Sequence, residues 1–283
     1  MRYQAILLFI TTLATVLTLK AQIYEGNSLQ ETNLASLVES VIPATIVLLG
    51  ESHGLQAHQN QHLEILKALK AKGLKVSVGL EFLNYPDQMF LDQYRSGELA
   101  ETSFLEIVKW NSIPFDFYRD QINFPNILQG EFSLALNLPR TISSKISKQG
   151  LESLTDDERA LLPPNFTLGR DSYKARFAAA AGAHCPSLER CFAAQSAWDD
   201  TMAYQAVKFI EAHPEQVLVI IVGEFHVQYG GGLAYRIHAR NIMVPVRSVS
   251  QIWAEDLTDV DLQKELQPSI EEGPRADYVW VSK

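Results

Sequence analysis

The sequence predicts an α/β protein with a mostly parallel sheet flanked by helices and a smaller inserted helical subdomain. Two observations carry this prediction: continuous apolar, β-branched runs that end at glycine, and segments between them with apolar residues at helical spacing. Such runs are typical of strands that are covered on both faces, as in parallel sheets. The 283 residues, 47% hydrophobic and 20% charged, are enough to bury the core of one large domain.

The first strand, helix and strand follow one another between residues 44 and 82. Residues 44–49 form an apolar run that ends at Gly50, residues 56–72 place leucines at helical spacing, and residues 75–82 form the second strand. This order is the right-handed crossover unit from which parallel sheets are built.

The same order recurs toward the C-terminus. We expect a helix over residues 193–212, a buried strand over 217–222, and edge or closing strands over 242–247 and 278–282. Pro245 favours an edge position, because proline has no N–H to donate within a sheet.

The stretch from about residue 84 to 194 separates these two parts. It is predicted to consist of helices and loops, interrupted by one strand near residues 132–137. We interpret it as the helical subdomain, inserted into the sheet or lying over it.

Residues 1–21 are predicted to be a secretory signal peptide, so that the folded domain spans residues 22–283. Arg2 precedes an apolar run over residues 5–19, which as a helix spans about 22 Å against a hydrocarbon core of roughly 30 Å. An uncleaved anchor is the alternative. We therefore expect an exported protein, periplasmic or secreted, and no lipid anchor, since no cysteine follows the run.

Cys185 and Cys191 are the only cysteines in the sequence. An even number of cysteines in an oxidising compartment favours a disulfide bond over two free buried thiols. We therefore expect one structural disulfide with a short loop.

The formal net charge of −9, from 24 basic and 33 acidic residues, provides no positive surface for a phosphate backbone. We therefore expect no nucleic-acid partner.

Acidic residues and histidines follow three of the predicted strands. The first and the late strand end in the same Gly-Glu-X-His pattern, with Glu51 and His53 in one and Glu224 and His226 in the other, and the second strand ends in Glu81. The carboxyl ends of neighbouring parallel strands meet at one edge of a sheet, where ligands bind in open α/β folds. We expect these side chains to form one cluster, which needs a positive partner because its glutamates repel one another.

This cluster supports a metal-dependent hydrolase, an esterase or peptidase, as one functional hypothesis. His53, His226, Glu51 and Glu81 are candidate ligands of a divalent metal such as Zn or Mn. A glutamate, Glu51, Glu81 or Glu224, would then activate water. In the alternative interpretation these carboxylates cap helices or position loops.

His58 and His62 stand four residues apart and share one face of the predicted helix. His58 extends the strand-end cluster. His62 continues the leucine stripe, so a hydrogen-bonded core histidine is favoured over a ligand.

Three glycines, residues 230–232, follow Tyr229 beyond the late strand. The spacing matches no nucleotide-binding motif. Tyr229 could present a phenolate to iron, a ligation that proteins use, or it could pack at the sheet edge.

Short motifs in a fixed order give the chain a family resemblance. The sequence resembles the ChaN-like haem-binding uptake proteins of the TraB/Tiki group and, distantly, the erythromycin esterases. The motifs lie at residues 49–53 with His58, 78–82, Gln88 with 91–94, Trp110, 137–140, Gln195 with 198–203, and 223–236.

The resemblance implies a haem-binding protein of iron uptake that performs no chemistry on its ligand. Haem would lie at a homodimer interface, held by a tyrosine of one subunit with a histidine of the other nearby, and an outer-membrane haem receptor is a possible partner. Our candidate ligands are Tyr229 or Tyr173, with His184 as the partner histidine. Further candidates are His58 near the cofactor and Arg140 or Arg236 at the propionates.

Overall fold

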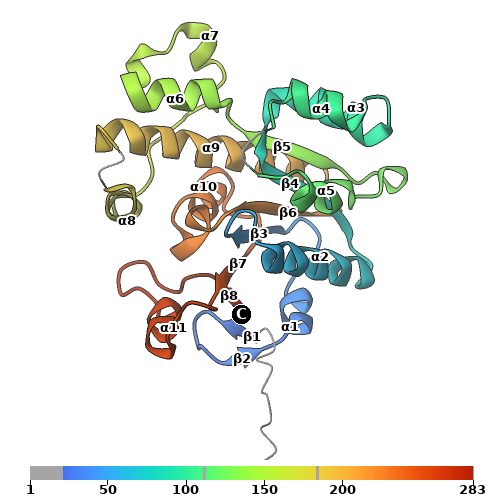
Figure 1. The fold of residues 1–283 in the computed structure, drawn as a ribbon, viewed down its shortest axis with the longest axis vertical. Helices are drawn as coiled ribbons and strands as arrows, with labels where there is room; N and C mark the ends of the chain where they lie inside the picture. The colour runs from blue at the N-terminus through green and yellow to red at the C-terminus, as the bar shows by residue number, and fades with distance from the viewer. Residues whose placement is uncertain (1–21, 111–112, 183–184, 283) are drawn as a thin grey trace, which may run out of the picture.

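A computed structural model describes residues 22–110, 113–182 and 185–282, which contain one eight-stranded sheet (Figure 1). The predicted signal peptide, residues 1–21, lies outside this part of the chain. The strands are β1 (Gln22–Glu25), β2 (Glu31–Thr32), β3 (Ile46–Glu51), β4 (Lys75–Asn84), β5 (Ser133–Asn137), β6 (Gln216–Gly223), β7 (Val246–Trp253) and β8 (Tyr278–Ser282).

The strand order is β2-β1-β8-β7-β3-β6-β4-β5. All pairs from β8 to β5 are parallel, and only β1 pairs antiparallel, with β2 and with β8. The predicted mostly parallel sheet is confirmed.

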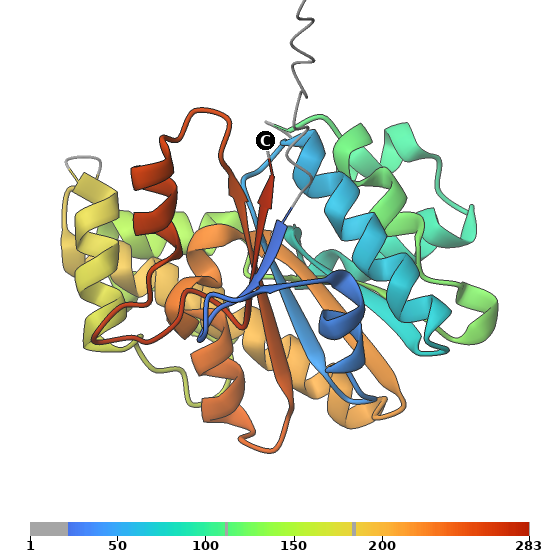
Figure 2. The same cartoon turned by 90° about the horizontal axis from the view of Figure 1, so that it is seen from below.

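Helices cover both faces of the sheet, the blue to mid-green ones on one side and the yellow-green to orange ones on the other (Figure 2). Within the described ranges no helix is long and apolar enough to cross a bilayer. The helices are α1 (Leu34–Glu39), α2 (Gln56–Ala71), α3 (Gln88–Ser96), α4 (Glu101–Ile107), α5 (Asp116–Asn123), α6 (Arg140–Gln149), α7 (Asp156–Arg159), α8 (Asp171–Ala181), α9 (Leu188–Ala212), α10 (Leu233–Arg240) and α11 (Asp259–Leu266).

The two faces of the sheet have separate apolar cores. In β3, Val47 and Leu49 pack with α1 to α5, whereas Ile46 and Leu48 pack with α9 and α10. Successive side chains of a strand point to opposite faces, so a strand buried on both sides is apolar throughout. This explains the unbroken apolar runs in the sequence.

The strand predicted over residues 242–247 was misplaced. β7 starts at Val246 and lies between β3 and β8, so it is not an edge strand. Pro245 stands just before it, where its carbonyl accepts a hydrogen bond from Ile46 N at 2.9 Å and no ladder N–H is needed. β8 is likewise internal, because β1, which the sequence analysis missed, pairs with its outer side.

The stretch between the two α/β parts contributes to both faces. Its strand β5 forms the outer edge of the sheet beside β4, and α9 begins earlier than expected, at Leu188. Helix α6 packs against α9 in a core of its own that includes Ile142 and Ala197. The division of the chain into domains stays a prediction.

The expected disulfide is present. Cys185 and Cys191 are bonded, with their Cα atoms 6.2 Å apart, within the range of ordinary disulfides. The bond ties Cys185, which precedes α9, to Cys191 in the first turn of that helix.

Candidate functional site

The three strand ends singled out from the sequence are neighbours. β6 lies between β3 and β4, and Glu51 pairs in register with Gly223. Glu51, Glu81 and Glu224 therefore stand at the same edge of the sheet, as the strand-end patterns predicted. Their side chains, however, enter different hydrogen-bond networks.

Glu51 forms a dyad with His53. Its buried carboxylate accepts hydrogen bonds from the Tyr118 hydroxyl, from Gln59 Nε2 and, at 2.9 Å, from His53 Nδ1. The His53 side chain is 39% exposed. Burial lowers the pKa of His53, but the hydrogen bond to Glu51 and the nearby charge of Glu81 outweigh it, so the pKa is raised.

Glu81, His226 and Asp199 form a second, more deeply buried network. His226 Nδ1 donates to Asp199 Oδ1 at 2.6 Å, and His226 Nε2 lies 3.5 Å from Glu81 Oε1. Burial lowers the pKa of His226, but Asp199 and Glu81 outweigh it and raise the pKa to about 10. For Glu81, burial raises the pKa, but His226 outweighs it and lowers the pKa to about 2. An imidazolium thus sits between two carboxylates, the positive partner that the cluster required.

Tyr173 extends this network away from the sheet edge. Its hydroxyl donates to Asp199 Oδ2 at 2.9 Å and accepts from Gln195 Nε2 at 3.0 Å, and the residue is 1% exposed. Burial and the charge of Asp199 raise the pKa of Tyr173 well above its ordinary value. The structure therefore holds Tyr173 as a buried, neutral hydrogen-bond donor.

The two networks meet at Gly223. A Cβ at this position would lie 3.0 Å from His53 Cε1 and Nε2, and the Gly223 N–H donates to Glu81 Oε2 at 2.6 Å. A side chain there would push the His53 ring aside by a few tenths of an ångström. The glycine that precedes Glu224 thus leaves room for the close approach of the imidazole.

Glu224 belongs to a third group. It accepts hydrogen bonds from the Ser250 hydroxyl and, at 3.1 Å, from Arg275 Nε. Burial raises the pKa of Glu224, although Arg275 opposes this. The repeated Gly-Glu-X-His pattern therefore does not give two equivalent Glu–His pairs, because the partner of His226 is Asp199.

The divalent-metal alternative is not supported. Within the described part of the chain no three or more His, Cys, Asp or Glu side chains are arranged to hold a metal ion. The predicted ligands Glu51, Glu81 and His226 already use their donor atoms on one another or on Tyr118, Gly223 and Asp199.

His58 and His62 are buried in α2. His58 Nδ1 accepts a hydrogen bond from Ser52 N at 2.9 Å, and burial, aided by His62, lowers the pKa of His58 to about 4. His62 Nε2 bonds Gln251 Oε1 at 2.7 Å, as expected of a core histidine. Both imidazoles are 0% exposed, so neither reaches the protein surface.

Tyr229 lies in the glycine-rich loop that follows β6. Its backbone is left-handed, with φ 57° and ψ 24°, a conformation that is uncommon outside glycine. Its N–H donates to Arg275 O at 2.6 Å, and its carbonyl accepts from Arg170 Nη2 at 3.1 Å. The half-buried side chain is thus fixed by its neighbours in a strained backbone, a feature that clusters at functional sites.

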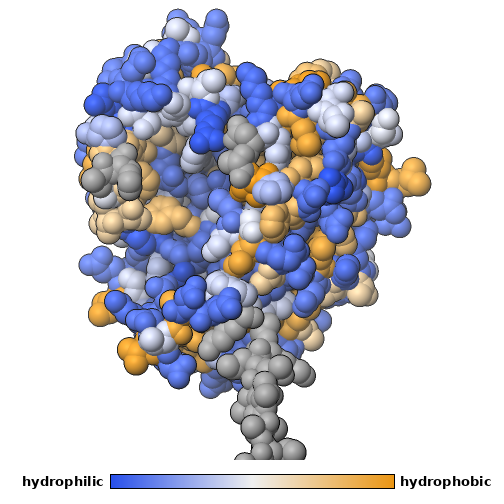
Figure 3. All heavy atoms as spheres, in the orientation of Figure 1, coloured by the Kyte–Doolittle hydropathy of each residue, from blue (hydrophilic) through white to orange (hydrophobic). Residues whose placement is uncertain are grey.

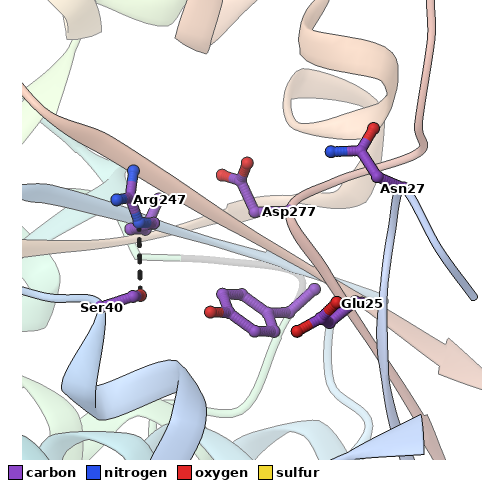
Figure 4. A pocket seen from close by; sticks show the side chains of 6 residues that line it. Glu25, Asn27, Ser40, Arg247 and Asp277 are labelled. Carbon is purple, nitrogen blue, oxygen red and sulfur yellow. Dashed lines mark hydrogen bonds between the residues drawn. The ribbon is translucent and has the colours of Figure 1, made fainter. Parts of the chain in front are cut away.

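A small polar pocket lies at the amino ends of the strands, opposite the glutamates, where β7 and β8 begin (Figure 4). There Arg247 Nε donates to Ser40 Oγ at 3.3 Å. No site residue predicted from the sequence lines this pocket.

The sequence profile described as haem-binding uptake, Tiki superfamily, ChaN matches residues 37–237. The chain belongs to this ChaN family. The structure of ChaN of Campylobacter jejuni, described as showing cofacial haem binding, matches with a TM-score of 0.67 at 18% identity, over 93% of this chain and 97% of that chain. This likeness confirms the ChaN-like α/β fold.

Two further solved structures resemble this chain less than the Campylobacter protein does. The type III effector HopBA1 has a TM-score of 0.46 at 12% identity, over 88% of this chain and 91% of that one. A mutant of the erythromycin esterase EreC has a TM-score of 0.47 at 13% identity, over 82% and 77%. No curated protein matches the chain.

The remaining residues predicted to contact haem differ in accessibility. Arg140 is exposed at the first turn of α6. Arg236 is 2% exposed, donates to Thr167 Oγ1 at 2.8 Å and pairs with Asp200 at 3.7 Å, so it holds α10 in place. His184 lies outside the described residues.

Side chains around Tyr229 fit a haem group. Phe225 and Phe177 are half-buried, with ring centroids 6.1 Å apart, and Arg176 lies over the Tyr229 ring. A phenol oxygen can ligate the iron, and apolar rings can cover the porphyrin. A guanidinium can pair with anionic oxygens.

Proposed function

We propose that the chain is an exported haem-binding protein of haem and iron uptake that ligates haem iron through Tyr229. The ligand assignment depends on the position of Tyr229, which is half-buried and has a strained backbone. The chain belongs to a family of haem-binding uptake proteins. A tyrosine phenolate is a known axial ligand of haem iron.

Burial favours Tyr229 over the other candidate, Tyr173. The Tyr173 hydroxyl is saturated by Asp199 and Gln195 and faces the protein interior. Ligation by Tyr173 would leave the buried Asp199 carboxylate without that donor, which costs roughly 1–3 kcal/mol.

Apolar surface beside Tyr229 supports a porphyrin site there. The alanine-rich helix α8 carries Phe177, and weakly hydrophobic side chains gather over α8 at the left edge of Figure 3. A porphyrin would cover this surface, and the exposed Arg140 would meet a propionate.

The proposal extends to a homodimer. The Campylobacter protein is described with cofacial haems, an arrangement that two copies of this chain would form with their Tyr229 loops facing. His184, which follows α8 in the sequence, would then supply the partner histidine. An outer-membrane haem receptor is the proposed partner in transport, with residues 1–21 as the export signal.

Tyr229→Phe tests the ligand assignment. Because phenylalanine lacks the oxygen, haemin bound to this variant should lack the phenolate-to-iron charge-transfer band, and affinity should fall by about tenfold or more, as for one lost ligand interaction of about 1.4 kcal/mol. Visible spectroscopy during haemin titration measures both.

Tyr235→Phe, at an exposed tyrosine of α10, is the matched control and should behave as wild type. An unchanged band in Tyr229→Phe would refute the ligand. Sedimentation velocity with saturating haemin should show a dimer, and a monomer would refute the interface.

A second candidate function rests on the Glu51–His53 dyad. His53 Nδ1 is held by Glu51, and the half-exposed ring can receive a proton at Nε2, which is the arrangement of a general base. The centroid of the Phe82 ring lies 5.0 Å from that of the His53 ring, so an apolar acyl group bound beside His53 would contact an aromatic side chain. This candidate is ester hydrolysis without a metal, in which His53 and not a glutamate activates water.

His53→Gln tests the second candidate. Hydrolysis of 4-nitrophenyl butyrate should fall at least about 100-fold, the lower range for loss of a general base, while EDTA has no effect on the wild type. The control His238→Gln removes an exposed histidine of α10 and should keep full activity. Equal rates for wild type and His53→Gln would end this hypothesis.

A further inference from the structure

The polar pocket at the amino ends of β7 and β8 takes no part in the functions proposed above. Its volume of about 200 Å³ is smaller than that of pockets for drug-sized ligands, so it has room for a small molecule. Segments distant in the sequence form its walls: the end of β1 and the turn after it, the residue after α1, and the starts of β7 and β8. The lining side chains all carry polar groups: Glu25, Asn27, Ser40, Arg247, Asp277 and Tyr278.

Arg247 is the one cation among the side chains that line the pocket. Its Nε donates to Ser40 Oγ at 3.3 Å and its Nη1 donates to Val246 O at 2.9 Å, so neutral oxygens hold the guanidinium in place. Within the described ranges the guanidinium forms no ion pair, and its Nη2 has no hydrogen-bond partner. The half-buried side chain can therefore donate to an anionic oxygen of a ligand.

Two carboxylates line the same pocket, and each is held through one of its oxygens. Asp277 Oδ2 accepts hydrogen bonds from Ser248 N at 2.8 Å and Ser248 Oγ at 3.0 Å, and Glu25 Oε2 accepts from Ser28 Oγ at 3.0 Å. Figure 4 shows both carboxylates set apart from Arg247. The pocket thus presents positive charge at one place and negative charge at another, with one oxygen of each carboxylate left for a ligand.

The two carboxylates are also held next to each other by the backbone. Gly26 N donates to Asp277 O at 2.8 Å, and a Cβ at Gly26 would overlap the carbonyl oxygen of Ala276. The turn after β1 therefore packs directly on the segment before β8. A ligand would meet charged groups that are already in position, which lowers the cost of binding.

We propose that this pocket binds a small zwitterion of the size of a free amino acid. The carboxylate of the ligand pairs with Arg247, and its ammonium group lies at Glu25 and Asp277. An anion without an ammonium group would face two carboxylates, and a cation without a carboxylate would bring a second positive charge beside the guanidinium. No residue of the proposed haem site lines the pocket, so this inference does not depend on the proposed function.

Titration of the ¹⁵N-labelled protein with L-alanine, followed by NMR, tests this inference. The backbone amide signals of Ser248 and Asp277 should shift saturably, because both N–H groups belong to the hydrogen bonds that hold the Asp277 side chain and segment. Two analogues serve as matched controls. Propionate is L-alanine without the ammonium group, ethylamine is L-alanine without the carboxylate, and neither should cause a saturable shift.

Variants of the charged groups test their separate roles. In Arg247→Gln the affinity for L-alanine should fall about tenfold or more, as for the loss of a hydrogen bond to a charged group. In Glu25→Gln it should fall about threefold, because the contact is between exposed charges. Arg159→Gln on α7 removes an exposed charge elsewhere and should bind as wild type does, and thermal unfolding of each variant checks the fold.

Several outcomes would overturn the inference. One is the absence of a saturable shift with L-alanine, and another is wild-type affinity in Arg247→Gln or Glu25→Gln. Saturable binding of propionate would show a simple anion site, and saturable binding of ethylamine would show a simple cation site. Either result would exclude recognition of a zwitterion.

Discussion

Replacing Asp199 with alanine should lower the free energy of unfolding by about 3–5 kcal/mol, the cost of removing one partner from a buried ion pair. Asp199 is fully buried and accepts from His226 Nδ1 at 2.6 Å and from the Tyr173 hydroxyl at 2.9 Å. Without it, the buried imidazolium keeps one carboxylate partner, Glu81, 3.5 Å away, and the Tyr173 hydroxyl loses its acceptor. Urea unfolding followed by circular dichroism measures the change.

The control for this prediction is Asp120→Ala, at an exposed carboxylate of α5, which should change stability by no more than about 0.5 kcal/mol. The double variant Asp199→Ala/His226→Ala should be less destabilised than the sum of the single variants, because it leaves no unpaired charge. A loss below about 1 kcal/mol in Asp199→Ala would show that the network does not stabilise the fold.

His226 should make the protein less stable in alkaline solution. Its pKa is raised from 6.5 to about 10. The stabilisation by the imidazolium is therefore complete below pH 6.5 and is lost as the pH rises toward 10. Glu81 acts in the opposite direction: its pKa is lowered from 4.5 to about 2, so its contribution is complete above pH 4.5 and is lost as the pH falls toward 2. The contribution of the pair is greatest between these limits, from pH 4.5 to 6.5.

Each unit of pKa shift corresponds to roughly 1.4 kcal/mol, so stability should fall by a few kcal/mol between about pH 6 and pH 10. The groups that face His226 are Asp199, Glu81, His53 and Gln195. In His226→Gln the alkaline part of the stability curve should flatten, because no imidazolium is left to deprotonate. Parallel curves for this variant and wild type, measured by urea unfolding across the pH range, would contradict the assignment.

The strand-end cluster and the tyrosine loop are structurally connected. A Cβ at Gly232 would lie 3.0 Å from both Asp199 Oδ1 and the Tyr173 hydroxyl. The buried network under His226 therefore also supports the loop that presents Tyr229. Features that were separate in the sequence analysis form one continuous region of the molecule.

The parallel sheet and the edge at which polar groups gather can both be predicted from the amino-acid pattern alone. Residues 46–49 and 217–222 are apolar at every position because both faces of the sheet are covered. The glutamates come directly after these strands, and parallel strands bring their carboxyl ends to the same edge. These inferences depend on local pattern and on the direction of the chain, which the sequence contains.

Which side chains act together depends on contacts between elements that are distant in the sequence. Glu224 and Glu51 occupy the same place in identical patterns. Glu224, however, pairs with Arg275, which is 51 residues away in the sequence. His226 pairs instead with Asp199 from α9. Tyr173 and Tyr229 were equivalent candidates until packing buried one and left the other half-exposed. The direction, burial and charge of a side chain depend on elements distant in the sequence, so no local pattern specifies them.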